Sequence, residues 1–121
     1  MLQGNFFTIR SIDVSDGSVT ADLELNPSHH IFDGHFPGTP VVPGVCMMQM
    51  IKEILENVVG RETMLVKADH IKFLVVINPN ENKTLTAGLK YTHDDNGHLS
   101  VIASLFIPGT TFFKFKGLFH S

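Results

Sequence analysis

Apolar and polar residues alternate along most of the chain, and a two-residue period of this kind is typical of β-strands with one buried face. The first two alternating runs, NFFTIRSIDV and SVTADLEL, are separated by Ser-Asp-Gly. Asp and Gly tolerate the backbone conformations of tight turns. The pattern therefore predicts a β-hairpin over residues 5–25.

Four further strand-like runs follow in the second half of the chain, at residues 64–77, 83–92, 98–107 and 111–119. Turn-forming sequences separate them: INPNEN, DDNG and PGT. The last run alternates most clearly, with Phe113 and Phe115 on one face and Lys114 and Lys116 on the other. We expect these runs to form antiparallel strands.

One stretch has a different period. VCMMQMIKEILENVV, residues 45–59, is apolar on most sides and places Gln49, Lys52, Glu53 and Glu56 on one stripe at helical spacing. Gly60 follows, and glycine commonly ends a helix in the left-handed conformation. The sequence predicts a largely buried helix here.

Residues 26–44 separate the hairpin from this helix and hold four of the six prolines and three of the ten glycines. Such a segment favours a rigid, shaped loop over regular structure. Two strands, one buried helix and then a run of strands is an α+β pattern in which a sheet wraps around the helix. We expect a single domain over residues 1–121.

Composition and charge limit the functional classes. The chain is 43% hydrophobic and carries a net charge of −3, which argues against a general nucleic-acid binder. The single cysteine, Cys46, excludes an internal disulfide, and its apolar surroundings predict a buried thiol. Residues 1–10 lack the apolar core of a signal peptide, and no run is long enough to span a membrane, so we expect a cytoplasmic protein.

The run GHFPGTPVVPGV, residues 34–45, resembles the active-site segment of the 3-hydroxyacyl-acyl carrier protein dehydratases of fatty-acid synthesis. The resemblance implies a hot-dog fold, a dimer with a continuous sheet, and an active site shared between subunits. It implies His35 as the base and a carboxylate fourteen positions later on the partner's helix. That position is occupied here by Gln49.

Dehydration of a 3-hydroxyacyl thioester requires a base, an acid, and a group that holds the enolate-like oxygen. Histidine suits the base because its ordinary pKa, about 6.5, leaves it mostly neutral at pH 7. The first N–H groups of the helix suit the oxygen, although an ordinary helix cap has the same geometry. Candidate substrate-binding residues lie in the loop and at the helix start: Phe36, Gly38, Pro43, Gly44, Val45 and Cys46.

The acid is where the sequence departs from its relatives. The Gln49 amide has no proton to give at neutral pH. The related dehydratases read E-x-x-x-Q, whereas residues 49–53 read QMIKE, so Glu53, one turn away, is a second candidate acid. Alternatively, the stripe is simply a polar face turned toward solvent or a subunit interface.

The partners follow from the same resemblance. Met47, Met48 and Met50 are candidates for lining an apolar acyl tunnel or, alternatively, plain core. For an acidic acyl carrier protein the candidate contacts are Arg61, Lys67, Lys72, Lys114 and Lys116. We expect no cofactor and no metal, because His29, His30 and His35 have only Asp33 near them as a further ligand.

Three functions are thus open. The first is a 3-hydroxyacyl-acyl carrier protein dehydratase, a hydro-lyase that acts as a dimer, either of two identical chains or with a related dehydratase. The second is a catalytically impaired subunit that binds carrier protein or pairs with an active homologue. A hot-dog thioesterase ranks last, because those enzymes also use a helix carboxylate.

Overall fold

The computed structural model describes residues 1–33 and 40–120. Two strands and a 3-10 helix precede the α-helix in the chain, and four strands follow it. The elements are β1 (Phe7–Ser15), β2 (Ser18–Leu25), the 3-10 helix η1 (His30–Phe32), α1 (Gly44–Val59), β3 (Met64–Phe73), β4 (Thr84–His93), β5 (His98–Ile107) and β6 (Thr110–His120).

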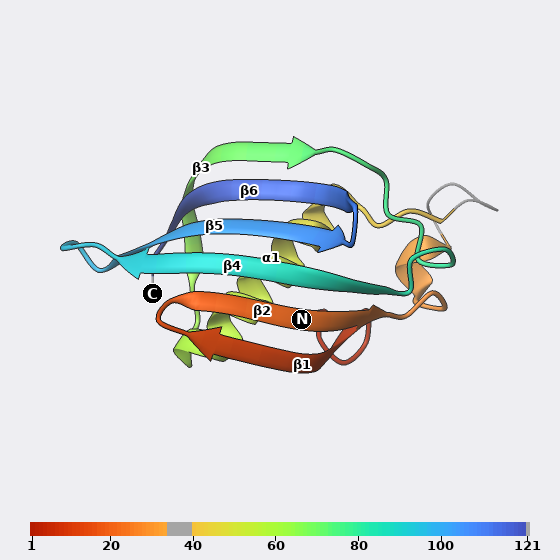
Figure 1. Ribbon diagram of the computed structural model, residues 1–121, viewed down its shortest axis with the longest axis horizontal. Coiled ribbons are helices and arrows are strands. Elements are labelled where there is room, and N and C mark those ends of the chain that lie inside the picture. The colour runs from red at the N-terminus through yellow and green to blue at the C-terminus, as the bar shows by residue number, and fades with distance from the viewer. Residues whose placement is uncertain (34–39, 121) are drawn as a thin grey trace.

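The strands form one six-stranded antiparallel sheet in the order β1-β2-β4-β5-β6-β3. Helix α1 lies across one face of this sheet, behind the strands in Figure 1, and the other face is turned toward the viewer. This is the predicted α+β hot-dog arrangement, so the fold class and the helix over residues 45–59 are confirmed.

Apolar side chains from alternate positions of the strands fill the space between the sheet and the helix. Phe113 and Phe115 on β6 are buried on the helix side, whereas Lys114 and Lys116 face outward, as predicted. From α1, Met50, Ile51 and Ile54 are fully buried against the same face. Burying a side chain of this size stabilises the fold by about 1.5–3 kcal/mol.

The first hairpin turns at Asp16 and Gly17, both in the left-handed region with φ of 47° and 78°. A Cβ on Gly17 would lie 2.6 Å from the Tyr91 carbonyl oxygen, so this turn is fixed against β4 as well as by its own backbone. Gly60, with φ of 76°, ends α1.

The predicted strand over residues 64–77 is four residues too long, because β3 ends at Phe73. Beyond it, the N–H groups of Leu74 and Val75 both donate to the Phe112 carbonyl, which takes the chain out of the ladder. Ile77 then accepts from the Val42 N–H and ties this segment to the start of α1. Within the described residues, no helix is long and apolar enough to cross a membrane.

Candidate active site at the start of the helix

Helix α1 begins without a side-chain cap. Pro43 precedes it in an extended conformation, and its carbonyl accepts from the N–H groups of Cys46 (3.0 Å) and Met47 (3.2 Å). Cys46 is therefore engaged within the helix start. The N–H groups of Gly44 and Val45 have no acceptor in the described part of the chain, and they lie at the positive end of the helix dipole.

Gly44 lines an apolar hollow of about 320 Å³ at the start of the helix. It is lined by Val41, Val42, Gly44, Met47 and residues 73–76. The Phe73 ring lies directly over Gly44, since a Cβ there would be 2.8 Å from its Cζ. Among the methionines named above, Met47 thus reaches the hollow, Met50 belongs to the core and Met48 is half-buried.

Apolar side chains around this hollow remain exposed. Val45 is 78% exposed, Phe73 56% and Val76 63%. A hollow with an apolar rim and unbonded N–H groups at one end suits an acyl thioester, whose carbonyl is polar and whose chain is not.

His35, Phe36 and Gly38 belong to residues 34–39, which lie outside the described residues. Their roles therefore stay predictions. On the described side of this segment, the His29 Nδ1 accepts from the Ile31 N–H (3.1 Å), and its ring stacks on that of His30, with 4.3 Å between centroids. Partial burial lowers the pKa of His29, as does the His30 charge, while Asp33 opposes them.

Glu53 is buried, only 3% exposed, and its carboxylate is surrounded by donors. The Leu2 N–H donates to both oxygens (3.0 and 2.8 Å), the Gln3 N–H donates to one (2.7 Å), and the Gln49 Nε2 donates to the other (2.9 Å). This carboxylate holds the N-terminal segment against the helix.

The same contacts orient the Gln49 amide. The Gln49 Nε2 group donates to a carboxylate oxygen, so the nitrogen of the amide faces Glu53. The Gln49 oxygen and one N–H then remain for a ligand. Gln49 is half-buried, and its role as a catalytic residue stays a prediction.

The rest of the predicted polar stripe has local partners. Lys52 pairs with Glu56 at 3.4 Å, and Glu56 accepts from the N–H (2.6 Å) and hydroxyl (3.2 Å) of Thr63. Sequence reasoning missed the partner of Glu53, because a backbone N–H carries no residue-specific signal. The spacing of Gln49, Glu53 and Asn57 at every fourth position was the available sign, since Asn57 donates to the Gln3 side chain at 2.9 Å.

Cys46 is buried, 6% exposed, in agreement with the prediction. Burial raises the pKa of its thiol and keeps it in the neutral form. Cys46 is therefore a small apolar residue of the helix start, and its contact with substrate stays a prediction.

In the described residues, one α-helix lies against a six-stranded antiparallel sheet, and this arrangement defines a hot-dog protein. The chain belongs to the ApeI-like family: the family model described as ApeI dehydratase matches residues 11–103.

Curated relatives agree with this assignment. The chain is 25% identical over 99 residues to the 3-hydroxyacyl-[acyl-carrier-protein] dehydratase FabZ of Oenococcus oeni, covering 76% of this chain and 71% of that protein. It is 29% identical over 85 residues to the FabZ of Lactococcus lactis subsp. cremoris, covering 64% of this chain and 59% of that protein. The match thus spans about three fifths of the second relative.

Solved structures share the fold. The dehydratase heterocomplex ApeI:P from Xenorhabdus doucetiae superimposes with a TM-score of 0.68 at 20% identity, covering 93% of this chain and 96% of that chain. A phenylacetic acid degradation-related protein from Ralstonia eutropha gives a TM-score of 0.66 at 16% identity, covering 95% of this chain and 84% of that chain.

Proposed function

We propose that this protein eliminates water from a 3-hydroxyacyl thioester carried by an acyl carrier protein. The observation that carries the proposal is the start of α1, where the N–H groups of Gly44 and Val45 have no acceptor among the described residues and Gly44 lines an apolar hollow. Membership of a dehydratase family and the GHFPGTPVVPGV segment support it.

In this reaction the His35 imidazole removes a proton from C2 of the acyl chain, and the charge that develops on the thioester oxygen is held by the helix-start N–H groups. The C3–O bond then breaks and a C2=C3 double bond forms. Gln49 has no proton to give, so the proton that leaves with the hydroxyl comes from the His35 imidazolium, and water departs. Gln49 orients the hydroxyl through its free amide oxygen.

The site is proposed to be completed by a second subunit. Strand β3 forms one edge of the sheet and exposes apolar side chains along its length, including Met64 at 70% and Val66 at 51%. An exposed edge strand pairs readily with another chain. Pairing two β3 edges would join two sheets and bring the helix start of each subunit toward its partner.

Turnover of a purified protein given a 3-hydroxyacyl N-acetylcysteamine thioester tests the activity directly, by the absorbance of the conjugated enoyl product. We expect turnover, and a loss of at least about 10²-fold in His35→Ala, since a positioned base contributes about 10²–10⁴-fold. Absence of turnover in the unmodified protein would contradict the proposal.

The variant Gln49→Glu tests whether a carboxyl group at this position increases the rate by acting as an acid. The introduced carboxyl would lie beside Glu53, and two carboxylates in contact raise the pKa of one of them, which makes that group a proton donor near neutral pH. We expect a rise in kcat. Glu53→Gln, measured alongside, separates this from a relocated acid: a loss of kcat with unchanged folding would assign the acid to Glu53.

A second candidate function is a subunit without its own turnover that pairs with an active dehydratase. Gln49 favours it, and a protein of the same fold forms the ApeI:P heterocomplex in Xenorhabdus doucetiae. Co-expression with a dehydratase from the same genome, followed by mass measurement of the complex, distinguishes the two: a 1:1 complex active only when mixed supports the second function. A thioesterase remains third, and release of free thiol from the acyl thioester would reveal it.

A further inference from the structure

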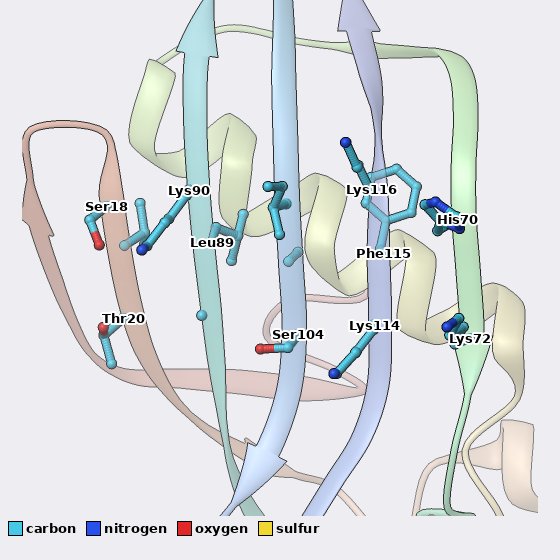
Figure 2. A pocket seen from close by; sticks show the side chains of 14 residues that line it. Ser18, Thr20, His70, Lys72, Leu89, Lys90, Ser104, Lys114, Phe115 and Lys116 are labelled. Carbon is cyan, nitrogen blue, oxygen red and sulfur yellow. The ribbon is translucent and has the colours of Figure 1, made fainter.

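The face of the sheet turned away from α1 contains a second and larger hollow, of about 640 Å³. Figure 2 shows this face, with α1 behind the strands and lysine side chains from β3, β4 and β6 around the hollow. We call it the lysine groove, and its outward-facing residues are His70, Lys72, Lys90, Lys114, Lys116, Ile102, Ser18, Thr20, Gly88 and Ser104.

Strand register arranges these residues in two rows across the sheet. The first row runs through cross-strand partners from β3 to β2: His70, Lys116, Ile102, Lys90 and Ser18. The second row runs beside it: Lys72, Lys114, Ser104, Gly88 and Thr20. Each row thus begins with basic residues at β3 and ends with a hydroxyl at β2.

The positive charge in the groove is uncompensated within the described residues. None of the four lysines takes part in an ion pair there, and no carboxylate lines the groove. Lys72 and Lys114 are direct cross-strand partners, an arrangement that destabilises a sheet. The chain as a whole has a net charge of −3, yet four lysines cluster on this face despite their mutual repulsion. This clustering points to an anionic ligand.

We propose that the lysine groove is the surface on which the acidic carrier protein docks. This inference rests on the proposed function, because it names the place where the carrier of the thioester binds. Carboxylates of the carrier would face the lysines, and an apolar side chain of the carrier would cover Ile102, which is 55% exposed at the centre of the first row.

The same face argues against a more extended polyanion. Asp22 points outward from β2 next to Thr20, the hydroxyl end of the second row, and it takes part in no ion pair within the described residues. A nucleic acid or an anionic membrane laid over the whole sheet would meet this carboxylate. A protein of limited contact area would cover the cationic half alone.

Position links the groove to the candidate active site. Lys72 is followed directly by residues 73–76, which line the hollow beside Gly44 on the other side of the sheet. A carrier held on the groove would therefore lie next to the end of β3, and its flexible thioester arm would pass this end to reach the helix start.

The test compares two triple variants that remove equal charge. Lys72→Gln/Lys114→Gln/Lys116→Gln removes three of the four groove lysines, whereas Arg10→Gln/Lys52→Gln/Lys83→Gln removes three cations outside the groove. KM and kcat are measured for one 3-hydroxyacyl group on acyl carrier protein and on N-acetylcysteamine. We expect the groove variant to raise KM for the carrier substrate by about tenfold, the combined effect of three exposed charge pairs, and to weaken its salt dependence.

For the small thioester, kcat/KM of the groove variant should stay within about twofold of the unmodified protein, because the groove and the hollow at the helix start have no lining residue in common. Equal KM increases in the two triple variants would overturn the proposal, and so would an equal loss with both substrates.

A binding measurement separates failure of this inference from failure of the proposed function. If the protein turns over neither substrate, the proposed function fails, and titration with acyl carrier protein alone then decides the docking surface. Weaker carrier binding in the groove variant than in the control variant supports the proposal. Absence of carrier binding overturns it, as does tighter, groove-dependent binding to anionic phospholipid vesicles or duplex DNA.

Discussion

Glu53 is a buried carboxylate whose two oxygens accept hydrogen bonds from other residues of the chain. The donors are the N–H groups of Leu2 and Gln3 and the side-chain amide of Gln49. Each of these donors would lose its partner if the carboxylate were removed, and an unsatisfied buried donor costs about 1–3 kcal/mol. The residue therefore contributes to stability and to the orientation of Gln49 together.

Glu53→Ala should lower the free energy of unfolding by about 2–4 kcal/mol, since part of the loss is recovered when residues 2–3 detach and bind water. Urea denaturation measures it. Glu62→Ala, in the exposed loop after α1, is the control and should change stability by less than about 0.5 kcal/mol. A similar small change in both variants would show that the N-terminal segment is not held by Glu53.

His29 makes stability depend on pH. Its folded-state pKa is lowered, so the unfolded chain binds the proton more readily, and protonation also removes the Nδ1 acceptor of the Ile31 N–H. The contribution of His29 to the free energy of unfolding is fully present above the unfolded-state pKa of about 6.5. It is lost as the pH falls from there toward the lower folded-state pKa.

His29→Asn should flatten this dependence, because an amide oxygen accepts the same N–H without titrating. Unfolding free energies at pH 7.5 and 5.5 measure the difference. The unmodified protein should lose more stability than the variant over this interval, and His93→Asn, which removes an exposed imidazole from β4, should leave the loss in place. Identical slopes in all three proteins would contradict the assignment.

At the scale of elements, the pairing of β6 with β3 depends on one residue without a side chain. A Cβ on Gly117 would lie 2.3 Å from the Lys67 carbonyl oxygen, where a bulge brings β3 close. Backbone must move to make room, and overpacking of this kind costs about 1–3 kcal/mol.

Gly117→Ala should therefore lower the thermal midpoint by several degrees, with the loss located in β3 by faster amide hydrogen exchange. Gly88→Ala on β4 is the matched control: its Cβ would meet the flexible Phe106 ring at 3.3 Å, which can turn aside. An equal or larger effect of the Gly88 substitution would argue against the close approach of β3.

Local periodicity was sufficient to predict the elements but not their contacts. Alternation placed Lys114 and Lys116 on the outer face of one strand, yet only the strand order brings Lys72 beside them and puts Lys90 on the same face, two strands away. The end of β3 was missed because residues 74–77 remain apolar while their N–H groups leave the ladder. Likewise, helical spacing put Gln49 next to Glu53, but their shared contact with residues 2–3 depends on a chain fold that no local pattern encodes.

At the scale of the molecule, the two edges of the sheet differ. On β1 the exposed apolar residues are Ile12 (38%) and Val14 (50%), set among polar neighbours. On β3, every residue is exposed, and Leu65, Val66, Ile71 and Phe73 are among them. An apolar edge of this length is a liability for a lone subunit, because its unpaired backbone groups and side chains invite association.

The proposed dimer joins two subunits through β3, which covers these side chains and extends the sheet. It also places His70 and Lys72 of one lysine groove close to those of the other subunit, so that docking and dimer formation share one end of the sheet. The oligomeric state and the carrier affinity should therefore change together when this edge is altered.

Sedimentation of the purified chain should give a dimer, and Val66→Lys/Ile71→Lys should shift it to a monomer, because four like charges would face one another across the joined edge. Ile12→Lys/Val14→Lys adds the same charge to β1 and should leave the dimer intact. The β3 variant should also bind carrier protein more weakly despite its two extra cations, since half of the joined groove is gone. A dimer that survives the β3 substitutions but dissociates with the β1 pair would place the interface at the opposite edge, far from residues 73–76 and the start of α1.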